Sequence, residues 1–200
     1  SPYTGTPFIS GTDFTAGVES FIDVSNINSA LNSGTNVSIS TGLQSEGTIT
    51  VNGSILKSAG GAATLTLTGA NIILGSATGY SITASGTGVG PLSVTLNSLS
   101  SGASGYYVNS YADMDLGGGT FTINNDFISF DHNYRGKILG NTALVKNGAS
   151  WLYLYNGGNT FYGGITLTKG IMLAQNDGSL GLGNNISITE SASIYMNSSN

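Results

Sequence analysis

The 200-residue chain has no cysteine and very little charge. Without cysteine it can form neither a disulfide framework nor a thiolate metal site. Charged residues make up only 8 % of the chain, whereas globular proteins contain roughly 25 %. The five Lys and Arg residues stand against ten Asp and Glu, for a net charge of −5. Binding to nucleic acid or to an anionic membrane needs a clustered basic face, so both classes of partner are excluded.

Proline, histidine and long apolar runs are also scarce. The chain has three prolines, and its hydrophobic content of 39 % is too high, with too little net charge, for a disordered segment. No apolar run approaches the roughly 18 residues of a membrane span, so we expect no membrane insertion of this segment. A single histidine, His132, argues against a zinc site. We therefore expect no cofactor, although a calcium site at Asp113 and Asp115 stays open as an alternative.

What the sequence has instead is glycine, 31 residues of it, between short runs of alternating polarity. The clearest run lies in residues 148–174, where Leu152 and Leu154 alternate with Trp151, Tyr153 and Tyr155. A period of two is typical of a strand with one face inward and one face outward. Helical periodicity is absent from this stretch, which predicts an all-β fold.

The alternating runs recur at a nearly constant interval. Cycles of three short strands start at Asn36, Ala63 and Pro91, which are almost evenly spaced along the chain. Self-similarity at a period of roughly 20–50 residues predicts a solenoid, and three strands per cycle predict a parallel β-helix with coils stacked about 4.8 Å apart. Neighbouring coils then share the burial of their apolar sides.

We interpret the chain as a single β-helix segment that belongs to a larger protein. Residues 1–35 form an irregular cap, with a short helical turn at 25–31. Regular turns follow at 36–105, a loop-rich excursion at 106–140, and further regular turns at 141–200.

The expected excursion concentrates charge, and loops on a rigid scaffold are where binding usually occurs. From it we select Asp126, Asp131, His132 and Arg135 as candidate binding residues. The same four residues could form an acid/base group with a clamp for a sugar carboxylate, as in a polysaccharide lyase or hydrolase. Asp113 and Asp115 are an alternative carboxylate pair. Their spacing matches no catalytic motif, and we predict that the chain is not an enzyme.

Two segments resemble known bacterial repeats. Residues 143–188 are similar to the autotransporter-associated β-strand repeat in Lys146-Asn147-Gly148, in Leu152 and Leu154, in residues 159–164 (NTFYGG) and in the corner at 181–183 (GLG). Residues 36–96 resemble the filamentous-haemagglutinin repeat through NVSIST (36–41), ITVNGSI (49–55) and LTLTGANIIL (65–74).

These resemblances imply a right-handed parallel β-helix on a secreted or surface-displayed bacterial adhesin, exported through a fused barrel or a partner transporter. The implied function is attachment without catalysis, as in virulence or biofilm formation. The partners would be a host-surface glycan or protein, or like adhesins through self-association. A purely structural stalk is the remaining alternative.

One departure from the autotransporter repeat is informative. Residues flanking the two inward leucines are usually small in that family, but here they are Trp151, Tyr153 and Tyr155. If the leucines point inward, the three rings point outward about 7 Å apart along the strand. Such a row could stack on sugar rings or anchor a protein. Alternatively, a loop from residues 106–137 could fold over the rings and bury them.

Overall fold

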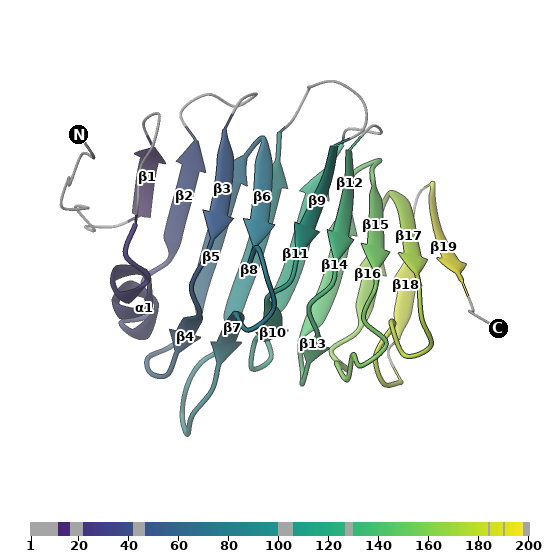
Figure 1. Ribbon diagram of the computed structural model, residues 1–200. Coiled ribbons are helices and arrows are strands. Elements are labelled where there is room, and N and C mark those ends of the chain that lie inside the picture. The colour runs from purple at the N-terminus through teal and green to yellow at the C-terminus, as the bar shows by residue number, and fades with distance from the viewer. Residues whose placement is uncertain are drawn as a thin grey trace.

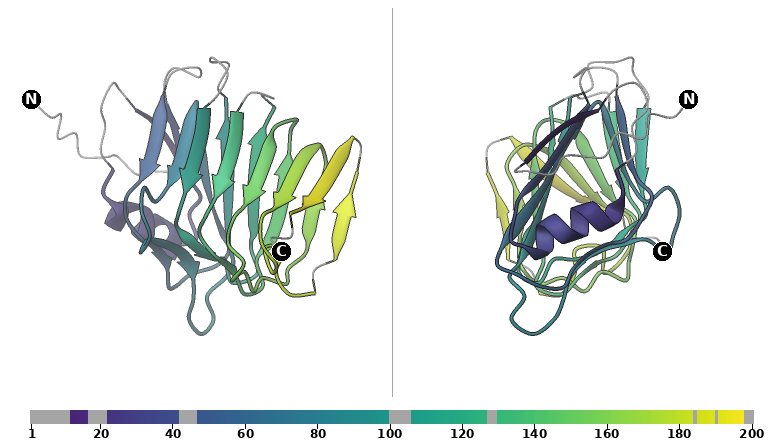
Figure 2. Two further views of the ribbon diagram at one scale, coloured as in Figure 1. Left: turned by 45° about the vertical axis from the view of Figure 1, so that its right-hand side comes forward. Right: turned by 90° about the vertical axis from the view of Figure 1, so that its left-hand side faces the viewer.

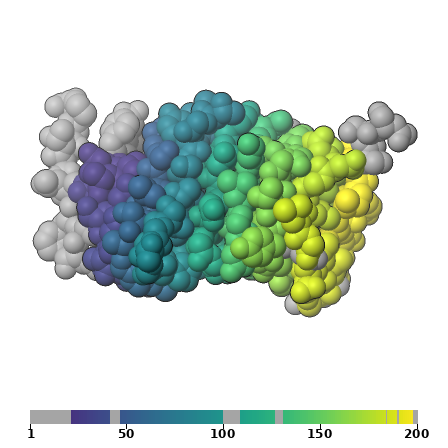
Figure 3. Space-filling view, turned by 90° about the horizontal axis from the view of Figure 1, so that it is seen from below, coloured from purple at the N-terminus to yellow at the C-terminus, as the bar shows by residue number. Residues whose placement is uncertain are grey.

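The protein is a parallel β-solenoid of about six turns. Its computed structural model describes residues 12–16, 22–41, 47–99, 106–126, 130–183, 185–189 and 191–197. Figure 1 shows the chain descending the near face and climbing the far face as it advances from N to C, which makes the solenoid right-handed. Seen from below, the coils follow one another as successive bands of an elongated body (Figure 3). The predicted fold class is thus confirmed.

The longest face of the solenoid is an eight-stranded parallel sheet, here called the long face. Its strands, in spatial order, are β1 (Thr12–Ala16), β2 (Val37–Thr41), β5 (Ala63–Gly69), β8 (Leu92–Ser98), β11 (Thr120–Asn125), β14 (Ala143–Asn147), β16 (Ile165–Leu167) and β18 (Ile186–Ile188).

Shorter parallel sheets form the other two faces. A two-stranded and a five-stranded sheet follow each other on one of them, here called the aromatic face, and a four-stranded sheet forms the third. The aromatic face contains β3 (Thr48–Val51) and β6 (Asn71–Leu74), then β9 (Tyr106–Ser110), β12 (Phe130–Tyr134), β15 (Trp151–Leu154), β17 (Gly170–Ala174) and β19 (Ala192–Met196). The third face contains β4 (Ile55–Lys57), β7 (Ser81–Ala84), β10 (Asp113–Asp115) and β13 (Ile138–Leu139).

The core consists of inward side chains stacked from coil to coil. Burial alternates along β5, β8 and β11, as the period of two predicts. In register, Leu65 pairs with Val94, Val94 with Phe121, and Phe121 with Leu144. All four are fully buried. Each such side chain contributes roughly 1.5–3 kcal/mol by leaving water.

Residues 106–140 do not form the loop-rich excursion that the sequence indicated. Their described residues form β9 to β13, each paired with a strand of a neighbouring coil. At the ends of β9 and β12 the inward positions hold Ser110, His132 and Tyr134, which hid the apolar alternation there. Tyr134, for example, is fully buried and its hydroxyl donates to the carbonyl of Ala112 at 2.7 Å.

The coils become shorter along the chain. Ser38 pairs with Thr66 near the N-terminal end, whereas Thr166 pairs with Ser187 near the C-terminal end, which is a distinctly smaller step in the sequence. The strands of the long face shorten too, from 7 residues in β5 and β8 to 3 in β16 and β18.

A column of amide and hydroxyl side chains runs across the outside of the long face. Asn124 donates its side-chain amide to the Oδ1 of Asn97 at 2.7 Å, and Asn147 donates to the Oδ1 of Asn124 at 2.8 Å. The column continues to Thr68 through Asn97 (3.1 Å) and to Thr168 through Asn147 (2.6 Å). We call this set the amide column. Such side-chain ladders link identical positions of stacked strands.

Two lysines are buried at corners between faces. Lys146 Nζ donates to the carbonyls of Asn147 at 2.8 Å and Gly148 at 2.7 Å. Lys57 Nζ likewise donates to the carbonyls of Ala59 and Gly60. Gly148 has a φ of +84°, a conformation that glycine adopts without strain. Burial lowers the pKa of Lys146 to about 8, and the charge of Asp126 partly opposes this.

Helix α1 (Val24–Asn32) lies at the N-terminal end of the core, as the view along the axis shows (Figure 2). It confirms the predicted helical turn. Asp23 caps it by accepting from the Ser25 amide at 2.8 Å, and Ile27 and Leu31 are buried against the coils. Asn28 Oδ1 accepts from the Leu56 amide at 3.0 Å. The helix therefore covers core and backbone that a further coil would otherwise pair. No helix in the described part of the chain is long and apolar enough to cross a membrane.

Candidate binding surface

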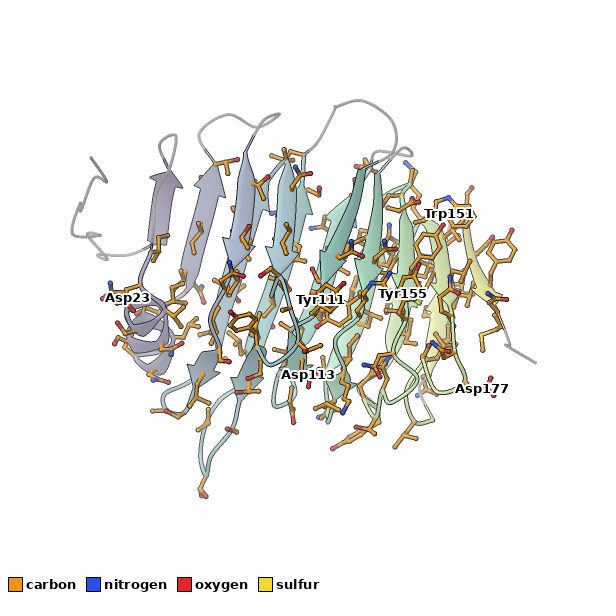
Figure 4. The ribbon with its side chains drawn as sticks, in the orientation of Figure 1. Asp23, Tyr111, Asp113, Trp151, Tyr155 and Asp177 are labelled. Carbon is orange, nitrogen blue, oxygen red and sulfur yellow. The ribbon has the colours of Figure 1, made fainter. Side chains whose placement is uncertain are left out.

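A row of aromatic rings lies on the outside of the aromatic face. Leu152 and Leu154 are buried, with exposed fractions of 0 % and 1 %, so Trp151, Tyr153 and Tyr155 point outward. The three rings are half-buried. Figure 4 shows Trp151 and Tyr155 on the near side of the sheet. The prediction that the leucines point inward and the rings outward is confirmed.

The rings are nearly parallel and evenly spaced. Trp151 and Tyr153 have ring centroids 5.7 Å apart with an interplanar angle of 20°, and Tyr153 and Tyr155 are 6.1 Å apart at 19°. Tyr195 of β19 adds a fourth ring, 6.4 Å from Trp151 at 8°. Tyr195 is 53 % exposed. We call these four residues the aromatic row.

The alternative that residues 106–137 fold over the row is wrong for the part of that segment that the structure describes. Its strand β12 pairs with β15 edge to edge, so it lies beside the rings in the same sheet. In register, Asn133 of β12 is the neighbour of Tyr153 on one side, and Leu173 of β17 is its neighbour on the other.

Arg135 marks one end of the aromatic row. Its guanidinium carbon is 4.0 Å from the centroid of the Tyr155 ring, and its Nε donates to the Oδ1 of Asn109 at 3.1 Å. Its backbone amide donates to the Ser110 carbonyl, which extends the β9–β12 pairing beyond β12. The cation is thus held in one place by a ring, an amide and the sheet.

Asp131 lies on the outer face of β12, on the same strand that leads to Arg135. Partial burial raises the pKa of this carboxyl, and a hydrogen bond with the Tyr153 side chain opposes the rise. The structure therefore brings together Asp131, Arg135 and the three predicted rings on one outer face.

His132 does not belong to this surface. It points into the core, is 2 % exposed, and its Nε2 lies 3.3 Å from the Ser110 hydroxyl. Burial, with a smaller contribution from the positive charge of Lys146, lowers its pKa to about 4. Alternation along β12 places its neighbours Asp131 and Asn133 on the opposite face.

Asp126 is also separate from the row. It follows β11, its side chain is 76 % exposed, and its carboxylate lies 3.8 Å from Lys169 Nζ. The predicted acid/base group of Asp126, Asp131, His132 and Arg135 is therefore divided among a corner, the outer face and the core.

Asp113 and Asp115 share the outer side of β10, with Met114 buried between them. Their carboxylates accept backbone amides, Asp113 from Lys137 at 2.7 Å and Asp115 from Gly117 at 3.4 Å. Within the described ranges, no group of three or more His, Cys, Asp or Glu residues could hold a metal ion.

Two members of the surface, Tyr195 and Asn109, escaped the sequence analysis. Tyr195 lies two strands beyond β15 in the sheet, and only the register through Leu173 shows that it joins the row. Asn109 lies in a stretch that the sequence did not identify as a strand. The spacing of about one coil between Leu173 and Tyr195 was a usable signal.

Fold and surface together define a parallel β-solenoid that presents an ordered aromatic row with a fixed cation at its end. Comparisons of the chain with protein-family models, with curated proteins and with solved structures gave no match.

Proposed function

We propose that the chain is a non-catalytic binding module of a bacterial surface-displayed or secreted adhesin, and that its aromatic row binds host-surface glycans. The observation that carries the proposal is the row itself, four near-parallel rings on a rigid sheet. Aromatic faces stack on the C–H faces of sugars, and the Tyr hydroxyl groups and indole N–H can bond to sugar hydroxyls. Rings fixed by strands lose little conformational freedom when a ligand binds.

The assignment to an adhesin rests on the resemblance of residues 143–188 and 36–96 to adhesin repeats. The scarcity of surface charge supports extracellular attachment over nucleic-acid or membrane binding.

The test is binding of the chain to a broad glycan array beside the variant Trp151→Ala/Tyr153→Ala/Tyr155→Ala. We expect specific glycans to bind the wild type, and the triple variant to lose them while retaining its fold by circular dichroism. Tyr162→Ala is the matched control, because Tyr162 is 59 % exposed but lies outside the row. Absence of binding by the wild type, or equal binding by the triple variant, would overturn the proposal.

Self-association with like adhesins is a second candidate, and the long face favours it. The outward positions of its three central strands carry only short uncharged side chains: Thr64, Thr66, Thr68, Ser93, Thr95, Asn97, Thr120, Thr122 and Asn124. Little repulsion opposes side-to-side packing of such faces. Sedimentation that depends on concentration, and that is abolished by Thr95→Lys, would support this candidate; a strict monomer would exclude it.

A polysaccharide-active enzyme is a weaker candidate, because Asp126 lies at a corner, Asp131 on the outer face of β12 and His132 in the core. Release of new reducing ends from any array glycan that the chain binds would support the enzyme as a candidate again.

A further inference from the structure

We infer that the aromatic row selects acidic glycans, and that it binds their carboxylate at Arg135. This inference rests on the proposed glycan binding and specifies the class of glycan.

The chain has five cationic residues. Lys57 and Lys146 are buried, and both direct Nζ to corner carbonyls. Lys169 faces Asp126 at 3.8 Å. Only Arg135 and Lys137 remain for a ligand.

These two cations lie at the same end of the aromatic row. Arg135 covers the ring of Tyr155. Lys137 is exposed, and its Cε lies near Gly158, three residues after Tyr155 in the chain. Of these two cations, Arg135 is the one that contacts a ring of the row. Such a local arrangement complements an anionic group on a ligand that is otherwise neutral.

Arg135 holds its guanidinium in a geometry that suits a carboxylate. A guanidinium has five N–H donors in a planar fork that matches a carboxylate. Asn109 accepts from Nε, and Tyr155 covers one face. Among the residues that the structure describes, no carboxylate forms an ion pair with Arg135. The terminal nitrogens are therefore available at a position that is fixed before the ligand arrives.

Acidic side chains near the row limit the charge density of a ligand that fits it. Asp131 shares the outer side of β12 with Arg135, and the extended strand between them separates their Cα atoms by about 13 Å. Asp113 accepts the backbone amide of Lys137. A glycan with a charge on every sugar would bring one charge close to Asp131, which repels it. The surface therefore fits a terminal or alternating acidic sugar better than a dense polyanion.

Carboxylated and sulfated glycans share this anion chemistry, so the experiment must separate them. We would measure affinities for two pairs that differ only in the carboxylate: sialyllactose with its carboxyl-reduced form, and a hyaluronan octasaccharide with its carboxyl-reduced form. A heparin octasaccharide serves as the densely sulfated probe. The proteins are wild type, Arg135→Gln, Arg135→Lys, and Lys169→Gln as a control for a cation that faces Asp126.

We expect wild type to bind at least one carboxylated probe about tenfold more tightly than its neutral partner, as one charge-assisted hydrogen-bond pair predicts. Arg135→Gln should remove this preference, so that the carboxylated probe and its neutral partner bind with equal affinity. Arg135→Lys should keep part of it, and Lys169→Gln all of it.

Four results would overturn the inference. Equal affinity for carboxylated and neutral probes, or a preference that survives Arg135→Gln, would refute the carboxylate site while glycan binding stands. A third such result is that heparin binds most tightly of the five probes and that Arg135→Gln and Lys169→Gln weaken its affinity equally. This would indicate general attraction of polyanions. Binding of none of the five probes, together with an empty glycan array, would refute the proposed function as well.

Discussion

The guanidinium of Arg135 and the ring of Tyr155 form a cation–π contact across two adjacent strands of the aromatic face, with 4.0 Å between the guanidinium carbon and the ring centroid. Contacts of this kind at partly exposed sites contribute about 0.5–1 kcal/mol. We expect a double-mutant cycle of Arg135→Gln and Tyr155→Leu, measured by urea unfolding, to give a coupling energy in this range.

Tyr155→Phe is the matched control for that cycle, because it keeps the ring and removes only the hydroxyl. A cycle of Tyr155→Phe with Arg135→Gln should therefore give a coupling energy near zero, because Phe keeps the contact with the guanidinium. Additive effects of the Gln and Leu substitutions would mean that the contact is not formed in solution.

Truncation of adjacent residues of β15 should affect stability and glycan binding in opposite order. Leu152→Ala removes a fully buried side chain and should destabilise the fold by about 2–5 kcal/mol. Tyr153→Ala removes a half-buried ring and should cost about 1 kcal/mol. Glycan binding should show the reverse order once each variant is assayed under conditions where it is folded. Equal destabilisation by the two substitutions would contradict the assigned inward and outward positions.

The amide column predicts a specific effect of Asn124→Asp. The wild-type amide donates to Asn97 and accepts from Asn147, whereas a carboxylate would turn a second acceptor toward Asn97. Asn97 can donate to that carboxylate only by reversing its amide, which also requires the Thr68 hydroxyl to change from acceptor to donor. We expect a loss of about 1–3 kcal/mol at neutral pH, measured by thermal or urea unfolding. Part of it should return below about pH 4, when the carboxyl protonates and can donate.

Asn28→Asp is the control for this substitution. Asn28 acts only as an acceptor for the Leu56 amide among its described bonds, and a carboxylate keeps that role. A change in stability much below that of Asn124→Asp is expected. If Asn124→Asp and Asn28→Asp lower the free energy of unfolding equally, the donor–acceptor order of the amide column does not contribute to stability.

His132 should make the fold sensitive to acid. Its pKa falls from 6.5 to about 4 because burial disfavours the charged ring. Between these values the unfolded chain binds a proton that the folded chain does not, so stability decreases as pH falls from 6.5 toward 4 and is constant above about 7.5. The full effect is on the order of 3 kcal/mol. His132→Gln has no titrating ring and should flatten this part of the pH profile.

The comparison between wild type and His132→Gln isolates the histidine from the aspartates, which titrate in both proteins. Urea unfolding at half-unit steps of pH from 4 to 8 would measure it. Parallel pH profiles for the two proteins would show that His132 is not buried as the structure places it.

The alternation of single residues was enough to predict much of the fold. Leu65 and Leu67 inward, Leu152 and Leu154 inward, and the helical turn ending near Leu31 all follow from local patterns that water enforces. The outward direction of Trp151, Tyr153 and Tyr155 follows from the same rule. These predictions need only one strand at a time.

Positions that depend on two coils could not be predicted in this way. Ser110, His132 and Tyr134 occupy inward positions because their polar atoms find partners inside, which the sequence does not reveal. Tyr195 and Arg135 reach the row only through the register of strands from three different coils. The shortening of the coils toward the C-terminal end also removed the constant period that would have aligned them.

The amide column has one further property. Every bond within it points the same way, because Asn97, Asn124, Asn147 and Thr168 each donate to the preceding coil. Aligned bonds polarise one another, and their dipoles add along the axis. The outside of the rod is therefore electrically directional, with its donors turned toward the helix α1 end. Two rods joined end to end could continue such a column only head to tail, which gives the solenoid a built-in sense of direction although it carries so little charge.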